Sequence, residues 1–320
     1  MKIVFQHSGV LPVKKYGGIE RILFWHMCEL AKRGHQVILF GHEDSDVEKF
    51  GIDLQVRGND WTNYIPSDTD VIHLTYSFEP HPTIPTLINI QGNGQIGEEF
   101  PLNTVFVSQK HAENHGSNCY IYNAVELSEY PFEPKNLPSI DKFMFLAKGS
   151  WSVKNLKHCI ELAKKTKKHL HIAGGKTFWP SRYITSHGMV GGDEKLAILK
   201  NSDALLFPVR WHEPFGIAII EAMAMGLPVF GSSYGSLPEL IIDSCGRTFE
   251  NKKEMIDFFQ EGKFNFDPSE IRKYVEKNFS IERLTDQYLI LYEKIFRGES
   301  LNSSPPSWVL DRPPLELLDF

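Results

Sequence analysis

The sequence predicts an α/β protein with two successive parallel-sheet domains. Short apolar runs alternate with longer segments that carry one apolar helical face, which is the pattern of βα units. The alternation stops at the proline-containing stretch 130–140 and then starts again. Because a chain of 320 residues is long enough for two domains, we expect two Rossmann-like sheets that face each other across a cleft.

The first domain is expected at residues 1–133. The largely apolar run Lys2–Gln6 predicts a buried strand, and Ile19–Arg33 predicts a helix because its apolar residues recur on one face before Gly34. We expect about five strands, each bounded by Pro, Gly, Asn or Asp. They are Lys2–Gln6, Gln36–Phe40, Val71–Thr75, Thr86–Ile90 and Thr104–Val107.

Residues 134–140 are predicted to be a linker, because Pro134 and Pro138 cannot lie inside a helix. The second domain is expected at 141–278. Its predicted strands are Phe143–Ala147, His169–Ala173, Ala204–Phe207 and Pro228–Gly231, and its predicted helices are Asn155–Lys164, Asp193–Lys200, Phe215–Met225 and Pro268–Asn278. Ligands of such sheets bind at the carboxyl ends of the strands, so the loops that follow the strands should hold the binding residues.

The C-terminal part begins with a helical pattern at Ile281–Phe296. The tail, residues 298–320, is rich in Ser and Pro and is expected to be extended or disordered.

The composition excludes several classes of partner. The 34 basic and 40 acidic side chains give a formal charge of −6, which disfavours nucleic acid as a partner. No stretch is long and apolar enough for a transmembrane segment, and the four cysteines form no C-x-x-C pair, which fits a reducing cytoplasm. No metal is expected, because Asp44 and Asp46 lie in an acidic loop and the histidines form no ligand cluster.

The most informative stretch is FPVRWHEPFGIAIIEAMAMGLPV, residues 207–229. It predicts a strand, a loop that bears Glu213, and a helix with Pro214 in its first turn. Gly216 would expose backbone N–H groups that can hold a diphosphate. Glu221, two turns along the helix, and Glu213 could accept hydrogen bonds from sugar and ribose hydroxyls. The alternative is that Glu213 only interacts with the helix dipole and Glu221 is a solvated residue.

This stretch resembles the E-x7-E signature of the retaining nucleotide-sugar glycosyltransferases of family 4, which have the two-domain GT-B fold. The resemblance covers about residues 1–297. Its further motifs are Gly226–Val229, Gly235–Glu239, Lys14–Arg21 with its glycine-rich loop, Asp70–His73, Tyr122–Glu126 and Phe279–Tyr292. By this resemblance, residues 279–297 form the closing helix that crosses back to the first domain.

The resemblance implies that Glu213 contacts the donor sugar and Glu221 the ribose, with the backbone after Phe215 on the distal phosphate. The full set of donor-binding residues that we expect is Glu221, Phe215, Gly216, Ile217, Gly17, Gly18, Met189 and Val190. Gly17 and Gly18 could instead form a plain tight turn.

Lys148 and Lys154 flank Trp151 after the first strand of the second domain, where two cations could neutralise the departing diphosphate. The family usually has Arg and then Lys here, so Lys148 offers a point charge in place of a bidentate guanidinium. Two solvated lysines at a helix start are the alternative.

The clearest departure from the family is Gln91, which stands where a histidine near the reacting sugar is usual. Glutamine forms hydrogen bonds but cannot act as a general base. Either the leaving phosphate takes the acceptor's proton, which we favour, or the enzyme is altered or inactive. His73 and Asn93 are expected on the acceptor side together with Gln91. The first domain is shorter than the family implies, which indicates a trimmed acceptor platform.

The sequence therefore predicts a cytoplasmic, metal-independent hexosyl- or N-acetylhexosaminyltransferase of the kind used in polysaccharide biosynthesis. As the resemblance implies, it would move a sugar with retention from a nucleoside diphosphate sugar, UDP-linked rather than GDP- or ADP-linked, to a hydroxyl acceptor and without a cofactor. The acceptor could be a glycan, a glycolipid or a small molecule. The alternatives are a nucleotide-sugar epimerase and a non-catalytic glycan- or nucleotide-binding relative.

The first helix and the loop before it have a basic end, which could contact the inner face of a membrane or an acidic glycan; a solvated helix end is the alternative. The residues are Lys14, Lys15, Arg21, Lys32 and Arg33.

Overall fold

The computed structural model describes residues 1–14, 17–175 and 181–320, and it divides into two compact units. Of the glycine-rich loop, Lys15 and Tyr16 lie outside the described residues. Unit 1 comprises Met1–Val13, Gly17–Ala124 and Ile281–Pro313, and the described part of unit 2 comprises Lys14, Val125–Ser280 and Pro314–Phe320. Each unit is therefore built from segments that are far apart in the sequence.

Unit 1 contains a six-stranded parallel sheet with the strand order β3-β2-β1-β4-β5-β6. The strands are β1 (Lys2–Gln6), β2 (Gln36–Phe40), β3 (Ile52–Gln55), β4 (Val71–Leu74), β5 (Thr86–Asn89) and β6 (Thr104–Val105). The predicted strands are confirmed, but the expected number of about five is wrong. The additional strand, β3, lies at the edge of the sheet, where an alternation of apolar and polar residues, Ile-Asp-Leu-Gln, replaces the apolar run of a central strand.

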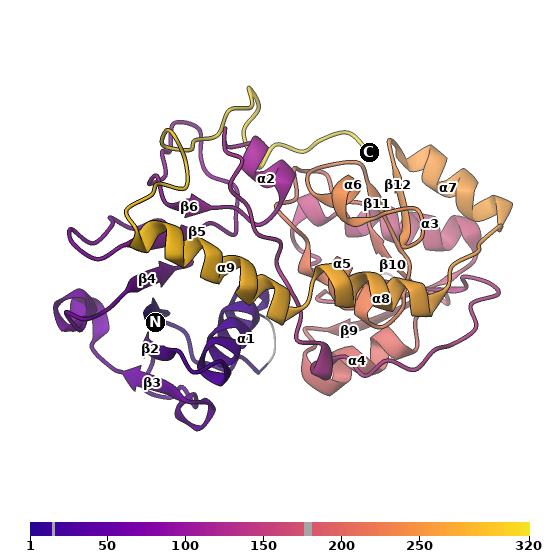
Figure 1. Cartoon of the computed structure of the whole chain (residues 1–320). Helices are drawn as coiled ribbons and strands as arrows, with labels where there is room; N and C mark the ends of the chain where they lie inside the picture. Colours follow the sequence, from indigo (N-terminus) through magenta and orange to yellow (C-terminus); the bar gives the residue numbers. More distant parts are fainter. Residues whose placement is uncertain (15–16, 176–180) are drawn as a thin grey trace. The chain divides into compact units, whose positions relative to one another are not determined.

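The helices of unit 1 include two long ones that pack against each other, α1 (Gly18–Lys32) and α9 (Ile281–Phe296), although they come from opposite ends of the chain (Figure 1). The short helices are α2 (Gln109–Glu113) and the 3-10 helices η1 (Glu48–Phe50) and η2 (Gly58–Tyr64).

A buried chain of hydrogen bonds joins α1, α9 and β4. The Tyr292 hydroxyl lies 2.6 Å from Nδ1 of His73 and 2.8 Å from Nε2 of His26, and the other ring nitrogen of His26 lies 2.9 Å from Oγ1 of Thr285. Buried polar groups need such partners, because an unmet hydrogen bond inside a protein costs about 1–3 kcal/mol. The position of α9 in unit 1 thus depends on two histidines of the N-terminal segment.

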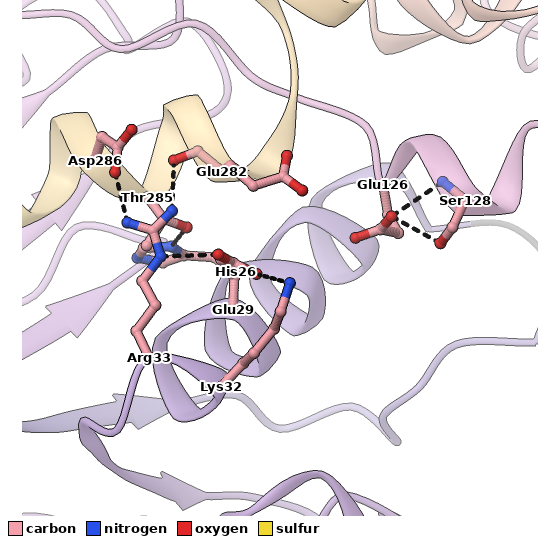
Figure 2. Close-up of polar contacts among 9 residues, drawn as sticks. All are labelled: His26, Glu29, Lys32, Arg33, Glu126, Ser128, Glu282, Thr285 and Asp286. Atoms are coloured by element: carbon pink, nitrogen blue, oxygen red, sulfur yellow. Dashed lines mark hydrogen bonds and ion pairs between the residues drawn. The ribbon is translucent and has the colours of Figure 1, made fainter.

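A second polar contact lies at the end of α1, where Figure 2 shows Arg33 between two carboxylates. Its Nε donates to Glu29 at 2.8 Å on the same helix, and its Nη1 donates to Asp286 of α9 at 2.5 Å. Its Nη2 donates to the Glu282 carbonyl at 3.0 Å. Arg33, which the sequence suggested as part of a basic end, is therefore engaged in holding α9.

Unit 2 contains a second six-stranded parallel sheet, with the order β12-β11-β10-β7-β8-β9. The strands are β7 (Lys142–Leu146), β8 (His169–Ala173), β9 (Ile184–Gly188), β10 (Ala204–Phe207), β11 (Val229–Ser232) and β12 (Gly246–Phe249). The predicted strands are confirmed, and the two that were missed, β9 and β12, are the edge strands. Both sheets are those expected for an α/β fold.

The helices of unit 2 are η3 (Leu127–Glu129), η4 (Ser152–Lys154), α3 (Leu156–Thr166), α4 (Gly192–Lys200), α5 (Ile217–Ala224), α6 (Leu237–Leu240), α7 (Lys252–Glu261) and α8 (Pro268–Asn278). Most of them lie between the strands in the chain, whereas η3 precedes β7, and α7 and α8 follow β12 (Figure 1). Among the helices of the described residues, none has the length and apolar character needed to span a bilayer.

The tail contributes to both units. In unit 1, Ser307 N–H donates to the His115 carbonyl at 3.0 Å, and Phe100 N–H donates to the Pro306 carbonyl at 2.8 Å. In unit 2, Leu318 N–H donates to the Arg210 carbonyl at 2.8 Å. The tail has no helix but is held by hydrogen bonds along its length.

We expect unit 1 to lose stability in mild acid, because it contains buried histidines. Burial lowers the pKa of His73 to about 3, so between that value and about 6.5 the unfolded chain binds a proton that the folded chain does not. Stability therefore falls as the pH falls; at pH 5.5 one such histidine costs about 1.4 kcal/mol. The midpoint of thermal unfolding, measured at pH 7.5 and 5.5, should drop less in His73→Gln than in the wild type.

The partly exposed His42 of the same unit is the matched control, and His42→Gln should leave the drop in the unfolding midpoint unchanged. If the unfolding midpoint dropped equally in His73→Gln and in the wild type, His73 would not be a cause of the loss of stability in acid.

Candidate functional site

The loop between β10 and α5 carries the first glutamate of the predicted motif. Gly216 has φ +85°, a left-handed conformation that a side chain would strain, and a Cβ there would lie 3.0 Å from Ile219 Cδ1. The helix therefore begins at Ile217, after this turn. The expectation that Pro214 lies in the first turn of the helix is wrong, because Gly216 interrupts the helical conformation between them.

A second turn fixes the backbone of this loop. Gly235 lies so close to Glu213 that a Cβ on it would be 2.3 Å from the Glu213 nitrogen. The next residue, Ser236, donates its N–H to the Glu213 carbonyl at 3.0 Å and its hydroxyl to the Phe215 carbonyl at 2.7 Å. Only glycine allows this approach, which accounts for the second glycine-containing motif of the sequence.

The Glu213 carboxylate is buried, with 6% exposure, and is held through one oxygen. Its Oε2 accepts from Lys154 Nζ at 2.5 Å and from Trp211 Nε1 at 2.7 Å. The Lys154 ammonium also lies 5.2 Å from the centre of the Phe207 ring and 5.0 Å from that of Trp211. Aromatic faces attract a cation, so the two rings help to hold the Lys154 ammonium in place beside Glu213.

The Glu221 carboxylate has the same kind of surroundings. It is 7% exposed, and its Oε1 accepts from Lys195 Nζ at 2.5 Å and from the Tyr130 hydroxyl at 2.6 Å. Lys195 is itself only 5% exposed and donates to the Tyr130 oxygen at 3.2 Å. Each glutamate is thus held by one lysine and one aromatic donor.

The second oxygen of each carboxylate, Oε1 of Glu213 and Oε2 of Glu221, has no partner among the described residues. An ionised carboxylate oxygen accepts strong hydrogen bonds from hydroxyl groups. The alternative that Glu221 is a solvated surface residue is wrong, because it is buried in an ion pair. The pair of carboxylates can therefore accept hydroxyls on either side of a helix start.

Other predicted donor-side residues follow the carboxyl ends of strands in the same sheet. Lys148 comes after β7, is exposed, and lies 5.3 Å over the Trp151 ring. Met189 and Val190 come after β9, the first 49% exposed and the second buried. Phe215, buried beside the Phe279 ring, precedes α5. Because the strands are parallel, these residues share one edge of the sheet with Glu213.

Gln91 in unit 1 follows β5, and its amide is largely occupied. Its Nε2 donates to Oδ1 of Asn89 and, at 3.2 Å, to Oδ1 of Asn123; in return Asn123 Nδ2 donates to Gln91 Oε1 at 2.8 Å. Both amide hydrogens are used, so Gln91 keeps one lone pair on Oε1 as its free capacity.

The loop that contains Gln91 and Asn93 is supported by two buried histidines. His111 Nε2 donates to the Gly92 carbonyl at 3.1 Å, and His115 Nε2 accepts from Gly94 N–H at 2.9 Å. Burial lowers the pKa of both imidazoles, which keeps them neutral with one donor and one acceptor nitrogen each.

The other predicted site residues of unit 1 lie away from the Gln91 loop, at the start of α1 and in β4. Gly17 precedes α1 with φ +149°, and Gly18 is the first residue of this helix. His73 points into the core toward Tyr292, and its Nε2 has no hydrogen-bond partner among the described residues. The structure does not bring His73 to a solvent-exposed acceptor surface.

The described residues contain no group of three or more His, Cys, Asp or Glu side chains that could hold a metal ion. In the acidic loop, Asp46 pairs with Lys49 at 2.5 Å, and Asp44 N–H donates to His42 at 3.1 Å.

Sequence reasoning named Lys154, which holds Glu213, but missed the other residues that hold the two carboxylates and Gln91. Lys195 follows Asp193 and Glu194 on a helix and looks like a surface lysine, and Tyr130 lies beside the prolines of the predicted linker. Trp211 lies within the motif itself, two residues before Glu213, and was the one detectable partner. Lys195, Tyr130 and Asn123 are distant in sequence from the groups that they contact.

The central part of the chain is similar to proteins of a known family. Residues 132–258 match the family described as "Glycosyl transferases group 1". A curated relative, "Spore coat protein SA" of Bacillus subtilis (strain 168), is 28% identical over 142 residues, which cover 40% of this chain and 35% of the relative. The chain thus spans about a third of the length of this curated relative.

Solved structures match over nearly the whole chain. AviGT4, a glycosyltransferase involved in avilamycin A biosynthesis, has a TM-score of 0.74 at 18% identity, over 93% of this chain and 99% of that one. Anabaena Alr3699/HepE in complex with UDP and glucose has a TM-score of 0.66 at 14% identity, over 92% and 99%. By fold the two parallel sheets are those of the GT-B glycosyltransferases, and by sequence residues 132–258 have the pattern of group 1 glycosyltransferases.

Proposed function

We propose that this protein is a retaining glycosyltransferase, as in family 4, that moves a hexosyl or N-acetylhexosaminyl group from a UDP-linked sugar to a hydroxyl acceptor. The match of residues 132–258 supports the class, and the UDP and glucose bound by Alr3699/HepE support the donor. The observation that carries the proposal is the pair of buried glutamates, Glu213 and Glu221, each with one oxygen fixed and one available.

The two carboxylates divide the donor between them. Glu213 orients the hydroxyls of the transferred sugar, and Glu221 accepts hydrogen bonds from the ribose hydroxyls. The diphosphate lies between them at the start of α5, where the backbone of Gly216 and Ile217 offers N–H groups that have no intrahelical acceptor.

The cations have different tasks in this proposal. Lys154 is paired with Glu213 and fixes the carboxylate that orients the sugar. Lys148 is exposed at the same edge of the sheet and has no ion pair with a described residue, so its charge stabilises the departing diphosphate.

The proposed transfer needs no nucleophile from the protein. The bond from the anomeric carbon to the phosphate oxygen breaks, and the acceptor oxygen bonds to that carbon from the same face. The acceptor's proton passes to the departing phosphate oxygen. Gln91 accepts a hydrogen bond from the acceptor hydroxyl through its remaining Oε1 lone pair, which orients the hydroxyl without taking its proton.

A product analysis tests the class. The protein is mixed with UDP-glucose, UDP-galactose or UDP-N-acetylglucosamine and a panel of glycoside acceptors in excess EDTA, and products are identified by mass spectrometry. We expect UDP and the transferred sugar in equal amounts, with most of the rate kept in EDTA. Isomerised donor without UDP would indicate an epimerase. UDP binding without turnover on any acceptor would indicate a non-catalytic relative.

Lys195 should control how tightly the ribose is held. Lys195→Met removes the cation that fixes Glu221, so we expect UDP to bind about 10-fold more weakly, the loss of about one hydrogen bond to a charged group. A UDP analogue without the 2′ and 3′ hydroxyls should bind equally to variant and wild type. Calorimetry measures both affinities.

The matched control is Lys200→Met, which removes an exposed lysine from the same helix. It should not change either affinity. If Lys195→Met weakened both nucleotides alike, Lys195 would support the fold and not the recognition of ribose.

Gln91 should affect the chemical step. Gln91→Ala should lower kcat about 10- to 100-fold, since one or two hydrogen bonds of the transition state are lost, and leave UDP affinity unchanged. Gln91→Glu should be slow without forming a glycosyl adduct, as intact-protein mass spectrometry would show. A trapped adduct would mean that a group at this position reaches the anomeric carbon, and full activity of Gln91→Ala would remove it from the site.

A further inference from the structure

Unit 1 contains a half-open pocket of about 470 Å³ that shares no residue with the site described above. It lies over the face of β4 and β5 to which Ile72 and Leu74 point, between η2 and the loop that follows β4. His73, between these two residues, points to the opposite face, which α1 and α9 cover. The volume of the pocket is in the range of small-molecule binding sites, about 300–1,000 Å³.

An aromatic wall forms one side of the pocket. The Trp61 ring is buried, with its centre 5.7 Å from the Phe40 ring and 5.8 Å from the Phe78 ring. Phe78 is 38% exposed, and its other neighbour is Tyr76, whose hydroxyl donates to Gln6 Oε1 at 2.6 Å. The exposed ring is therefore held in place on two sides and presents a flat apolar surface.

The loop that bears His81 is shaped by its own hydrogen bonds. Nδ1 of His81 accepts from the N–H groups of Thr83 at 3.3 Å and Ile84 at 3.1 Å. The His81 N–H donates to Thr86 Oγ1 at 3.1 Å, and this hydroxyl donates to the Ile84 carbonyl at 3.1 Å. Because Nδ1 is an acceptor, a neutral His81 carries its proton on Nε2, which is then a donor.

Glu79 supplies a hydrogen-bond acceptor to the pocket, which complements the donor of His81. It lines the pocket, is exposed, and has no ion pair within the described parts of the chain. Its carboxylate is therefore an acceptor available to a ligand. The pocket thus combines a fixed apolar ring, a hydrogen-bond acceptor and a hydrogen-bond donor.

This combination selects among ligand classes. An acyl chain would bury Glu79 and His81 without hydrogen bonds, which is costly. A quaternary ammonium would use Phe78 and Glu79 but would leave the donor of His81 unmatched. A pyranose ring has one apolar face of C–H groups and a rim of hydroxyls that both donate and accept, so it matches all three residues.

We propose that this pocket binds a sugar ring of the acceptor glycan, with its C–H face on Phe78 and its hydroxyls on Glu79 and His81. The proposal rests on the proposed function, since it takes the acceptor to be a glycan. It adds a second place at which unit 1 holds that glycan, on a different part of the sheet from Gln91.

Fluorine NMR separates this proposal from the proposed function. The full chain, with its six tryptophans replaced by 5-fluorotryptophan, is titrated with methyl glycosides of glucose, galactose and N-acetylglucosamine, and separately with UDP. Trp61 reports on the pocket and Trp211, bonded to Glu213, on the donor site; Trp61→Phe and Trp211→Phe assign the two signals. We expect at least one glycoside to shift the Trp61 signal and UDP to shift the Trp211 signal.

Variants of the pocket sharpen the test. Phe78→Ala should weaken glycoside binding about 3- to 10-fold, the loss of one aromatic contact, and leave UDP binding unchanged. Tyr64→Ala removes an exposed aromatic of η2 that does not line the pocket and should change neither.

Two results would overturn the proposal. One is a Trp61 signal that no glycoside shifts while UDP still shifts Trp211, which leaves the donor site intact. The other is a Trp61 signal that responds to tetramethylammonium or octanoate but to none of the glycosides. A Trp211 signal unaffected by UDP would instead count against the proposed function.

Discussion

The candidate site depends on two buried lysine–carboxylate pairs. A carboxylate with 6% or 7% exposure has lost most of its contact with water, and Lys154 and Lys195 replace that contact by pairing with Glu213 and Glu221. Each lysine binds one oxygen together with an aromatic donor, so the orientation of the carboxylate is fixed before any ligand arrives. Preorganised acceptors lose little entropy on binding, which suits recognition of a hydroxyl-rich molecule.

The backbone around these pairs is set by glycines and by parallel strands. Gly216 turns the chain so that α5 starts after the loop, and Gly235 lets a neighbouring turn pack against the Glu213 backbone. The parallel order of β10, β7, β8 and β9 brings the loops of separate βα units to one edge of the sheet. Side chains that are far apart in the sequence can thus hold one carboxylate, as Tyr130 and Lys195 hold Glu221.

The sequence was sufficient for the fold class, the central strands and the position of both glutamates, because apolar runs and glycine-containing motifs are local signals. It did not reveal β3, β9 or β12, since edge strands need no continuous apolar run. It also could not show that Asn123 pairs with Gln91 or that Lys195 pairs with Glu221, because contacts between distant residues leave no periodic pattern. The pocket beside Trp61 arises in the same way, from a 3-10 helix and a loop that only the folded sheet brings together.

The division of the chain into interleaved segments has a consequence for biosynthesis. Unit 1 needs Ile281–Pro313, and unit 2 needs Pro314–Phe320, so neither unit has all its parts when the ribosome has made the first 280 residues. Until α9 emerges, His26 and His73 lack the tyrosine hydroxyl that joins them, and the part of the sheet that α9 covers, at β4 and β5, is exposed. Folding of the N-terminal segment on the ribosome would thus be held in a partly assembled state, in which a chaperone that covers this face has time to act.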